Sequence, residues 1–338
     1  MPVNVAVLGC GYWGPNLIRN FLKLPRARLA LCCDLNPATL EKVRRQYPGV
    51  ETTTDPGQVL ANPAIEAVAI ATPARTHFEV ARECLLAGKH VLVEKPLALN
   101  VSHAEELVCL ARERGRVLMV GHTFEYNAAV RRLKRYIDEG DLGRVYYVYS
   151  TRVNLGQVRD DVNAMWNLGP HDFSILIYLL GAMPLRVSAR GSSFLQAGIE
   201  DVVFVDLEFP DGVMAHVHLS WLDPSKVRRM TVVGEEKMVV YDDVDNEAPL
   251  KLYDKAITRL VPPDGAFGEF HLRLRAGDIL IPRLELREPL ETECADFVES
   301  IASGTPPQTD GENGLRVVKV LAAAQASLHA QGAWQAIE

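Results

Sequence analysis

The first part of the chain alternates short apolar runs with stretches of helical periodicity. Residues 3–8 form an apolar run rich in β-branched side chains, which predicts a buried strand, and residues 16–24 place apolar side chains at helical spacing. Further strands are predicted at 29–33, 65–71, 90–93 and 117–120, with a short edge strand within 50–55. Strands separated by helices indicate right-handed crossovers and a parallel sheet.

Prolines and polar residues predict where the intervening helices begin. Pro37 and the pair Asp55-Pro56 each open a helix, because proline is favoured in a first helical turn. Ser102 is predicted to cap the helix that carries Leu107.

The pattern changes after Gly121. Helices are predicted over 128–139 and 170–180, the second opening at Pro170, and a strand over 145–153 lies between them. From Val187 onward, successive runs alternate polar and apolar residues with a period of two. Such runs are typical of an antiparallel or mixed sheet with one wet or subunit-covered face. Helices return at 290–303 and 313–329.

These patterns predict an α/β protein with two domains. Residues 1–122 are expected to form a Rossmann domain with a doubly wound parallel sheet. Residues 123–338 are expected to form an α+β domain with a large, mostly antiparallel, open-faced sheet. The length of 338 residues agrees with this division, since about 150 residues per domain are usual.

Composition and charge narrow the class of protein. A hydrophobic content of 48% and a charged content of 23% are typical of a soluble globular chain. A net charge of −7 argues against a nucleic-acid partner, and no apolar run reaches the roughly 18 residues of a membrane span. The N-terminus lacks a secretory signal, and the six cysteines lack metal-binding spacing. We therefore expect a cytoplasmic protein with reduced core thiols and no bound metal.

A glycine-rich loop joins the first predicted strand to the first helix. Gly9, Gly11 and Gly14 form a G-x-G-x-x-G pattern, whose glycines let backbone N–H groups approach a pyrophosphate at a helix N-terminus. Asp34 ends the second strand, about 20 residues beyond Gly14, where a carboxylate binds a ribose 2′-OH. The pattern favours NAD over NADP. The alternative interpretation is an ordinary glycine turn with a surface aspartate.

Other polar residues also follow predicted strands. Ligands of open parallel sheets bind beyond the carboxyl ends of the strands. The residues expected at this edge are Gly9, Asp34, Thr72, Lys95 and His122. Tyr12 and Trp13 are expected either to pack on the cofactor or to anchor the first helix.

Several of these segments together resemble the Gfo/Idh/MocA oxidoreductases. The matching segments are Gly9 to Gly14, Ala71-Thr72-Pro73 with His77, Ala87 to Val91, Glu94-Lys95-Pro96 and Thr309-Asp310-Gly311. The region from Thr151 to Asp172 is similar to the branch that acts on nucleotide sugars, including the UDP-N-acetylglucosaminuronic acid and UDP-N-acetylglucosamine 3-dehydrogenases. The resemblance implies that Thr72, Pro73, His77 and Glu94 line the dinucleotide site, and that the Lys95–Pro96 bond is cis.

The resemblance also assigns the candidate catalytic residues, Lys95 and His171. Hydride transfer from an alcohol needs a proton acceptor and a cation near the developing charge, and a lysine beside the nicotinamide ribose supplies both. The neutral ring of His171 can also take a proton near neutral pH. The family often has aspartate four residues before this histidine, whereas this chain has Asn167, which positions a hydroxyl but accepts no proton. The alternatives are a surface lysine and a capping or packed histidine.

Four polar residues at the end of the strand at 145–153 and just after it are candidates for substrate binding. They are Arg152, Asn154, Arg159 and Asp161, joined by Asn167 and His171. Arginine forks suit phosphate and carboxylate groups, so a UDP diphosphate or a uronate is a plausible target. The alternative is a solvated charged loop.

The expected reaction is therefore NAD-dependent oxidation of a secondary hydroxyl of a nucleotide-linked sugar such as UDP-N-acetylglucosaminuronic acid. Oxidation at C3 would give a 3-keto sugar. Alternatives are a keto-sugar reductase, a dehydrogenase of free sugars or inositols, and a non-catalytic dinucleotide sensor. The half-exposed sheet favours a homodimer or homotetramer.

Overall fold

The computed structural model describes residues 2–156, 158–260, 271–285 and 287–338. The chain divides into two compact units, which we describe separately. The first unit comprises Met1–Asn127 with Arg287–Ala322, and the second comprises Ala128–Leu286 with Ala323–Glu338. This division differs from the single predicted boundary after residue 122, because a segment near the C-terminus belongs to the first unit.

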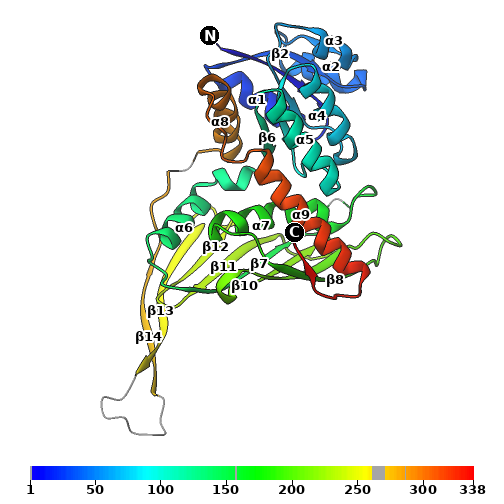
Figure 1. Cartoon of the computed structure of the whole chain (residues 1–338). Helices are drawn as coiled ribbons and strands as arrows, with labels where there is room; N and C mark the ends of the chain where they lie inside the picture. Colours follow the sequence, from blue (N-terminus) through cyan, green and yellow to red (C-terminus); the bar gives the residue numbers. More distant parts are fainter. Residues whose placement is uncertain (1, 157, 261–270, 286) are drawn as a thin grey trace. The chain divides into compact units, whose positions relative to one another are not determined.

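The first unit is built on a six-stranded sheet whose strands are all parallel (Figure 1). Its order, β3-β2-β1-β4-β5-β6, is that of a doubly wound dinucleotide-binding sheet, as predicted. The strands are β1 (Val3–Leu8), β2 (Ala27–Cys33), β3 (Thr52–Thr53), β4 (Ala67–Ile70), β5 (His90–Glu94) and β6 (Leu118–Gly121).

Helices flank this sheet, and the last of them continues into the second unit from Ala323 onward. They are α1 (Gly14–Lys23), α2 (Pro37–Gln46), α3 (Pro56–Ala61), α4 (His77–Leu86), α5 (Val101–Glu113), α8 (Pro289–Ser303) and α9 (Gly311–His329), with short 3-10 helices η1 (Ala74–Thr76) and η2 (Thr123–Tyr126). The predicted starts at Pro37 and Pro56 are confirmed. The predicted cap Ser102 is wrong: the side chain of Asn100 accepts from the backbone N–H of His103, so the helix begins one residue before Ser102.

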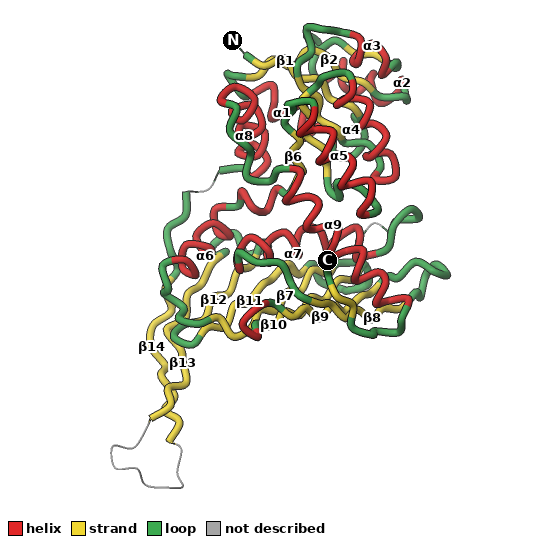
Figure 2. The backbone as a smooth tube through the Cα atoms, viewed as in Figure 1, coloured by secondary structure: helices red, strands yellow, loops and turns green. Residues whose placement is uncertain are grey.

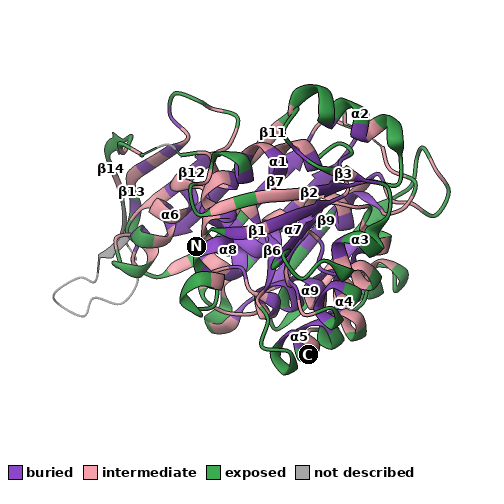
Figure 3. Ribbon diagram, turned by 90° about the horizontal axis from the view of Figure 1, so that it is seen from above, coloured by how far each residue is buried: buried purple, intermediate pink, exposed green. Residues whose placement is uncertain are grey.

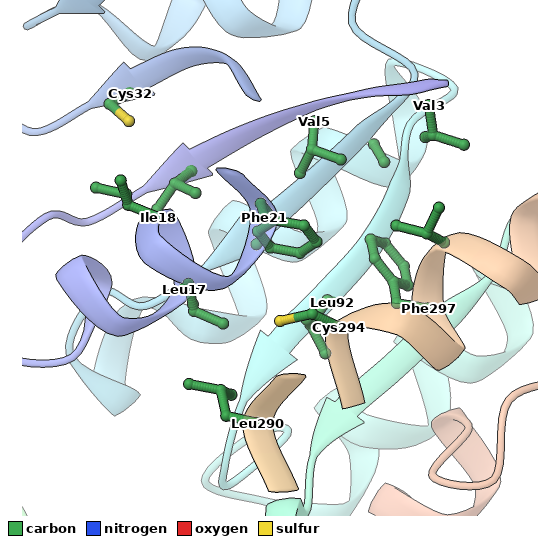
Figure 4. Close-up of a cluster of buried hydrophobic side chains, with 14 of the residues drawn as sticks. Val3, Val5, Leu17, Ile18, Phe21, Cys32, Leu92, Leu290, Cys294 and Phe297 are labelled. Carbon is green, nitrogen blue, oxygen red and sulfur yellow. The ribbon is translucent and has the colours of Figure 1, made fainter. Parts of the chain in front are cut away.

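An apolar cluster joins α8 to the parallel sheet and explains why this helix belongs to the first unit. Phe21 of α1, Val5 of β1 and Phe297 of α8 are all fully buried in it (Figure 4). Burying such a side chain stabilises the fold by roughly 1.5–3 kcal/mol. Arg19 of α1 adds two hydrogen bonds to Glu288, just before α8, at 2.7 and 2.5 Å. These contacts hold α8 on the sheet although the segment that precedes it belongs to the second unit.

The second unit is built on a nine-stranded sheet, ordered β14-β13-β12-β11-β7-β10-β9-β8-β15. Among the described strand pairs only β7 and β10 run parallel, so the predicted, mostly antiparallel sheet is confirmed. The strands are β7 (Val145–Val153), β8 (Arg186–Ser192), β9 (Val202–Glu208), β10 (Met214–Ser220), β11 (Val227–Gly234), β12 (Met238–Asp242), β13 (Leu250–Leu260), β14 (His271–Leu280) and β15 (Gln335–Ala336), with η3 at Pro210–Gly212.

Two helices, α6 (Ala128–Asp138) and α7 (Ala164–Leu180), cover one face of this sheet (Figure 2). Burial alternates along the strands accordingly: Val203 and Val205 of β9 are buried, whereas Phe204 between them is exposed. Strands of the first unit such as β1 and β6 are, by contrast, buried along nearly their whole length (Figure 3). The nine-stranded sheet is therefore open on its other face, as predicted.

Helix α7 begins earlier than predicted. Asn163 caps it by accepting from the backbone N–H of Trp166 at 3.0 Å, and Pro170 lies inside the helix and not at its start. An internal proline removes one helical hydrogen bond, which costs about 3 kcal/mol or more. Buried contacts along α7, including Phe173 and Leu176, offset this cost. His171 consequently lies in the middle of a helix and not at a helix start. Within the described ranges, no helix is long and apolar enough to cross a membrane.

Candidate active site

The glycine loop of the first unit forms a cradle that side chains would fill. A Cβ on Gly14 would lie 2.2 Å from the carbonyl oxygen of Gly9, and Gly9 itself has a φ of +89°. A Cβ on Gly11 would meet nothing within 4 Å, so the backbone there faces open space. Tight packing at Gly9 and Gly14 and openness at Gly11 are what a loop needs to place N–H groups against a pyrophosphate. The residues present fit a dinucleotide.

Asp34 closes one side of this cradle. One carboxylate oxygen accepts from the backbone N–H of Cys10 and the other from that of Asn36, both at 2.8 Å. These bonds orient the partly exposed carboxylate, and each oxygen keeps a second lone pair for a ribose hydroxyl.

Trp13 and Glu94 meet within the first unit. The Trp13 indole lies within hydrogen-bonding range of the Glu94 carboxyl group. Burial raises the pKa of Glu94 to about 7, although the charge of Lys95 and the indole both favour ionisation. Tyr12, by contrast, is 89% exposed. The two aromatic residues, predicted together, therefore occupy different environments.

The ring of His77 contacts two segments of the candidate site. Its Nδ1 lies 2.7 Å from the carbonyl oxygen of Pro96, and its Nε2 lies 2.9 Å from that of Thr72. The side chain is 1% exposed and connects the segments that carry Thr72 and Lys95, so its place in the dinucleotide site stays a prediction. The Lys95–Pro96 peptide bond is cis, as the resemblance implied, and Pro73 beside Thr72 is exposed.

His122 is also buried, and a network that the sequence did not reveal holds it. The imidazole Nδ1 lies 2.6 Å from Oδ1 of Asn313, and the Asn313 amide nitrogen donates to Glu125 at 3.0 Å. Gln308 donates to the backbone carbonyl of Glu125 at 3.1 Å. Burial lowers the pKa of His122 to about 4 and raises that of Glu125 to about 7. The only signal in the sequence was the family-like segment at Thr309-Asp310-Gly311, which precedes Asn313.

In the second unit, the Arg152 side chain is buried in an ion pair. It is 4% exposed, and its Nε donates to Asp172 of α7 at 2.5 Å. Ser150 donates to the other oxygen of Asp172 at 2.6 Å. Burial disfavours the charge on Arg152, but the carboxylate of Asp172 outweighs this effect and the pKa of the guanidinium is raised. Arg152 therefore ties β7 to α7, next to His171, and it does not present its fork to solvent as the predicted substrate-binding role requires.

Asn167 and His171 both lie on α7, and the indole of Trp221 donates to the Asn167 carbonyl oxygen at 3.2 Å. The Arg159 guanidinium donates two hydrogen bonds to the Asp161 carboxylate, at 2.7 and 2.8 Å. The Arg159 side chain is 35% exposed, so it is the more accessible of the two predicted arginines, and Asn154 is partly exposed. Lys95 belongs to the first unit and His171 to the second, so their meeting over one nicotinamide face stays a prediction.

No group of three or more histidine, cysteine or acidic side chains in the described ranges is arranged to hold a metal ion. All six cysteines are free thiols, and five of them are buried, whereas Cys109 is exposed.

Comparison with known proteins agrees with this arrangement. Residues 3–122 match the model of an oxidoreductase family described as having an NAD-binding Rossmann fold, and residues 130–240 match the GFO/IDH/MocA C-terminal domain. The chain belongs to the Gfo/Idh/MocA oxidoreductase family and is an NAD(P)-dependent oxidoreductase.

Three similar proteins illustrate the range of the family. UDP-N-acetylglucosamine 3-dehydrogenase from Acidithiobacillus ferrooxidans is 28% identical over 94% of each chain, and its solved structure has a TM-score of 0.81, with 98% of this chain and 99% of that chain covered. A scyllo-inositol 2-dehydrogenase (NAD(+)) from Bacillus subtilis is 31% identical over 69% of this chain and 72% of its own. GenD2 from gentamicin A biosynthesis, solved in complex with NAD, is 26% identical with a TM-score of 0.83, covering 100% of this chain and 97% of its own.

Proposed function

We propose that this enzyme oxidises a secondary hydroxyl, at C3, of a UDP-linked amino sugar or its uronate, with NAD as the cofactor. The similarity that carries this proposal is the one to the UDP-N-acetylglucosamine 3-dehydrogenase, since it extends over 94% of both chains. The Asp34 carboxylate, held by two backbone N–H groups, supports NAD because it would repel a 2′-phosphate.

The residues divide the chemical work as follows. The nicotinamide, when bound, accepts a hydride from the carbon that bears the hydroxyl. The Lys95 amine follows strand β5 at the edge where ligands of such sheets bind, and it accepts the hydroxyl proton or stabilises the negative charge that develops on the oxygen. His171 is the alternative acceptor for that one proton, and Asn167 orients the hydroxyl because its amide cannot accept a proton. Arg159 holds an anionic group of the substrate, a phosphate or a carboxylate.

A mixture of enzyme, NAD and the UDP sugar tests the proposal directly. We expect the NADH absorbance band to rise with UDP-N-acetylglucosamine or its uronate, and NAD to be used with a kcat/KM about tenfold or more above that of NADP, equivalent to about 1.4 kcal/mol. A keto-acid acceptor is included to reoxidise NADH that the enzyme retains. NADH formation only with inositols or free sugars would favour the alternative indicated by the inositol dehydrogenase relative. Cofactor binding without turnover on any of these substrates would contradict both.

We also propose that the open face of the nine-stranded sheet joins copies of the chain. Phe204 stacks on His218 with ring centroids 4.4 Å apart, and Tyr147 and Tyr149 line the same face of neighbouring β7. Phe204 is 43% exposed and Met214 is 61% exposed, and contiguous apolar surface of this kind marks an association site.

Phe204→Glu is therefore expected to yield monomers in light scattering after size-exclusion chromatography, whereas the wild type elutes as a dimer or tetramer. Phe194→Glu is the matched control, because Phe194 is 71% exposed but lies outside the strands of the sheet. A monomeric wild type, or an unchanged oligomer in Phe204→Glu, would refute this interface.

A further inference from the structure

The ring of His122 is held in one orientation by groups on two other elements. Both oxygens of the Glu125 carboxylate, on η2, receive amide hydrogens: Oε1 from Asn313 at 3.0 Å and Oε2 from Gln308 at 3.4 Å. The amide nitrogen of Asn313 therefore faces Glu125, and its carbonyl oxygen faces His122 at 2.6 Å. Because a carbonyl oxygen only accepts, Nδ1 of His122 carries the hydrogen.

This tautomer leaves a lone pair on Nε2. The ring is neutral near pH 7, since burial lowers the pKa of His122 to about 4. Nε2 is inaccessible to solvent and makes no hydrogen bond to any of the described residues. A buried acceptor without a donor costs free energy, so a donor that reaches Nε2 during the enzyme's work would recover that cost.

The strand register identifies the donor. Glu94 of β5 pairs with Gly121 of β6 in parallel register, so Lys95 and His122 leave adjacent strands at the same level. The charge of Lys95 contributes to the low pKa of His122, which places the amine near the ring. An ammonium group has three hydrogens to donate and a flexible four-carbon stem, so it can supply one to Nε2.

We propose that His122 is a positioning residue for Lys95: its Nε2 accepts a hydrogen bond from the Lys95 amine, while Asn313 and Glu125 fix the tautomer that makes this possible. The idea rests on the proposed function only in that Lys95 handles the substrate proton there. It adds Asn313 on α9 and Glu125 on η2 to the residues that determine the position of the catalytic amine.

Other charged groups surround this network and define what its pH dependence must include. Glu94, the last residue of β5, precedes Lys95. The pKa of Glu293 on α8 is raised by burial and then by the charges of Glu94 and Glu125. Near the start of α9, the charge of Arg316 lowers the pKa of Glu125 and that of Asp310 raises it. The pKa of the Lys95 amine must therefore be compared between variants that leave all these charged groups in place.

The first experiment measures the pKa of the Lys95 amine by NMR of protein labelled with ¹⁵N-lysine, with the resonance assigned by its loss in Lys95→Met. His122→Leu removes the acceptor and should lower the pKa of the amine, because the ammonium form loses a hydrogen bond. His122→Gln keeps an acceptor and should restore most of the wild-type value. Equal values in all three proteins would overturn the proposal. No turnover is needed, so a wrong substrate assignment does not affect this outcome.

The second experiment uses Asn313→Asp, which keeps the shape of the side chain. The second oxygen of the aspartate faces Glu125, whose raised pKa lets it keep the proton that two facing carboxyl groups share. The carboxylate beside Nδ1 then favours the doubly protonated ring, so ¹⁵N NMR of histidine should show a hydrogen on Nε2. kcat/KM should then fall about 100-fold, as expected when a catalytic group is misplaced, while NADH binding stays near the wild-type value. Tyr126→Phe is the matched control: it removes from η2 a hydroxyl that donates to Asp296 at 2.7 Å and lies 3.2 Å from the Thr309 hydroxyl oxygen, and it leaves His122, Asn313 and Glu125 in place. Wild-type kcat/KM in Asn313→Asp, or an equal loss in Tyr126→Phe, would overturn the proposal.

Discussion

Lys95→Met is expected to lower kcat/KM by about 10²–10⁴-fold, the contribution typical of a general acid–base group. Lys95 follows β5 directly and precedes a buried proline, so methionine, which is similar in length, should leave the local packing intact. The Kd for NADH, measured by fluorescence titration, should change only a few-fold. Both measurements together distinguish lost chemistry from a lost cofactor site.

Lys95→Arg separates the two roles proposed for this amine. Arginine keeps the positive charge but does not accept a proton, because its pKa lies above 12 in proteins. If Lys95 is the proton acceptor, Lys95→Arg should be nearly as slow as Lys95→Met. If Lys95 only steadies developing charge, Lys95→Arg should recover a large part of the rate. Lys42→Met, an exposed lysine on α2, serves as the control and should behave like the wild type. Wild-type kcat/KM in Lys95→Met would contradict the catalytic role altogether.

Arg152→Met is expected to destabilise the protein by about 3–5 kcal/mol, because it leaves the buried carboxylate of Asp172 without its charged partner. The two side chains are 5% and 2% exposed and 2.5 Å apart, so water cannot replace the guanidinium. Urea denaturation followed by circular dichroism measures the loss. Removing both charges in Arg152→Met with Asp172→Leu should cost less than Arg152→Met alone, because no unpaired charge then remains buried.

Arg159→Met is the matched comparison for that measurement. Arg159 pairs with Asp161 but is 35% exposed, so its contribution to stability should stay within about 1 kcal/mol. Its loss should instead raise the KM for the UDP sugar. If Arg152→Met kept wild-type stability and raised KM in the same way, Arg152 would be a substrate ligand, as the sequence alone suggested.

The contrast between these two arginines shows where sequence reasoning reached its limit. Both arginines lie within one short stretch at the end of a strand, and both have the side chain that anionic substrates require. Arg152 is at a position of β7 that faces the helix layer, whereas Arg159 lies beyond the strand. Asp172, the partner of Arg152, is 20 residues away in sequence, and no local pattern indicated the pair.

Helix starts were predictable only where the cap is local and unambiguous. Asn36 and Asp55 cap the helices that the adjacent prolines predicted. Asn100 and Ser102 are both capping residue types, and only the backbone shows that Asn100 accepts the N–H. At α7 the proline misled the prediction, because tertiary contacts compensate the bond that Pro170 removes.

The sequence by itself determined the parallel sheet, its glycine loop, Asp34 at the end of the second strand, and the open antiparallel sheet that follows. Those features depend on local periodicity and on residues close together in the chain, which one sequence displays directly. Only the tertiary structure decided that α8 and the start of α9 belong with the first unit, that Asp172 pairs with Arg152, and that Asn313 holds His122. Asn313 and His122 are 191 residues apart, and contacts at such separations depend on how buried faces pack, which no local pattern encodes.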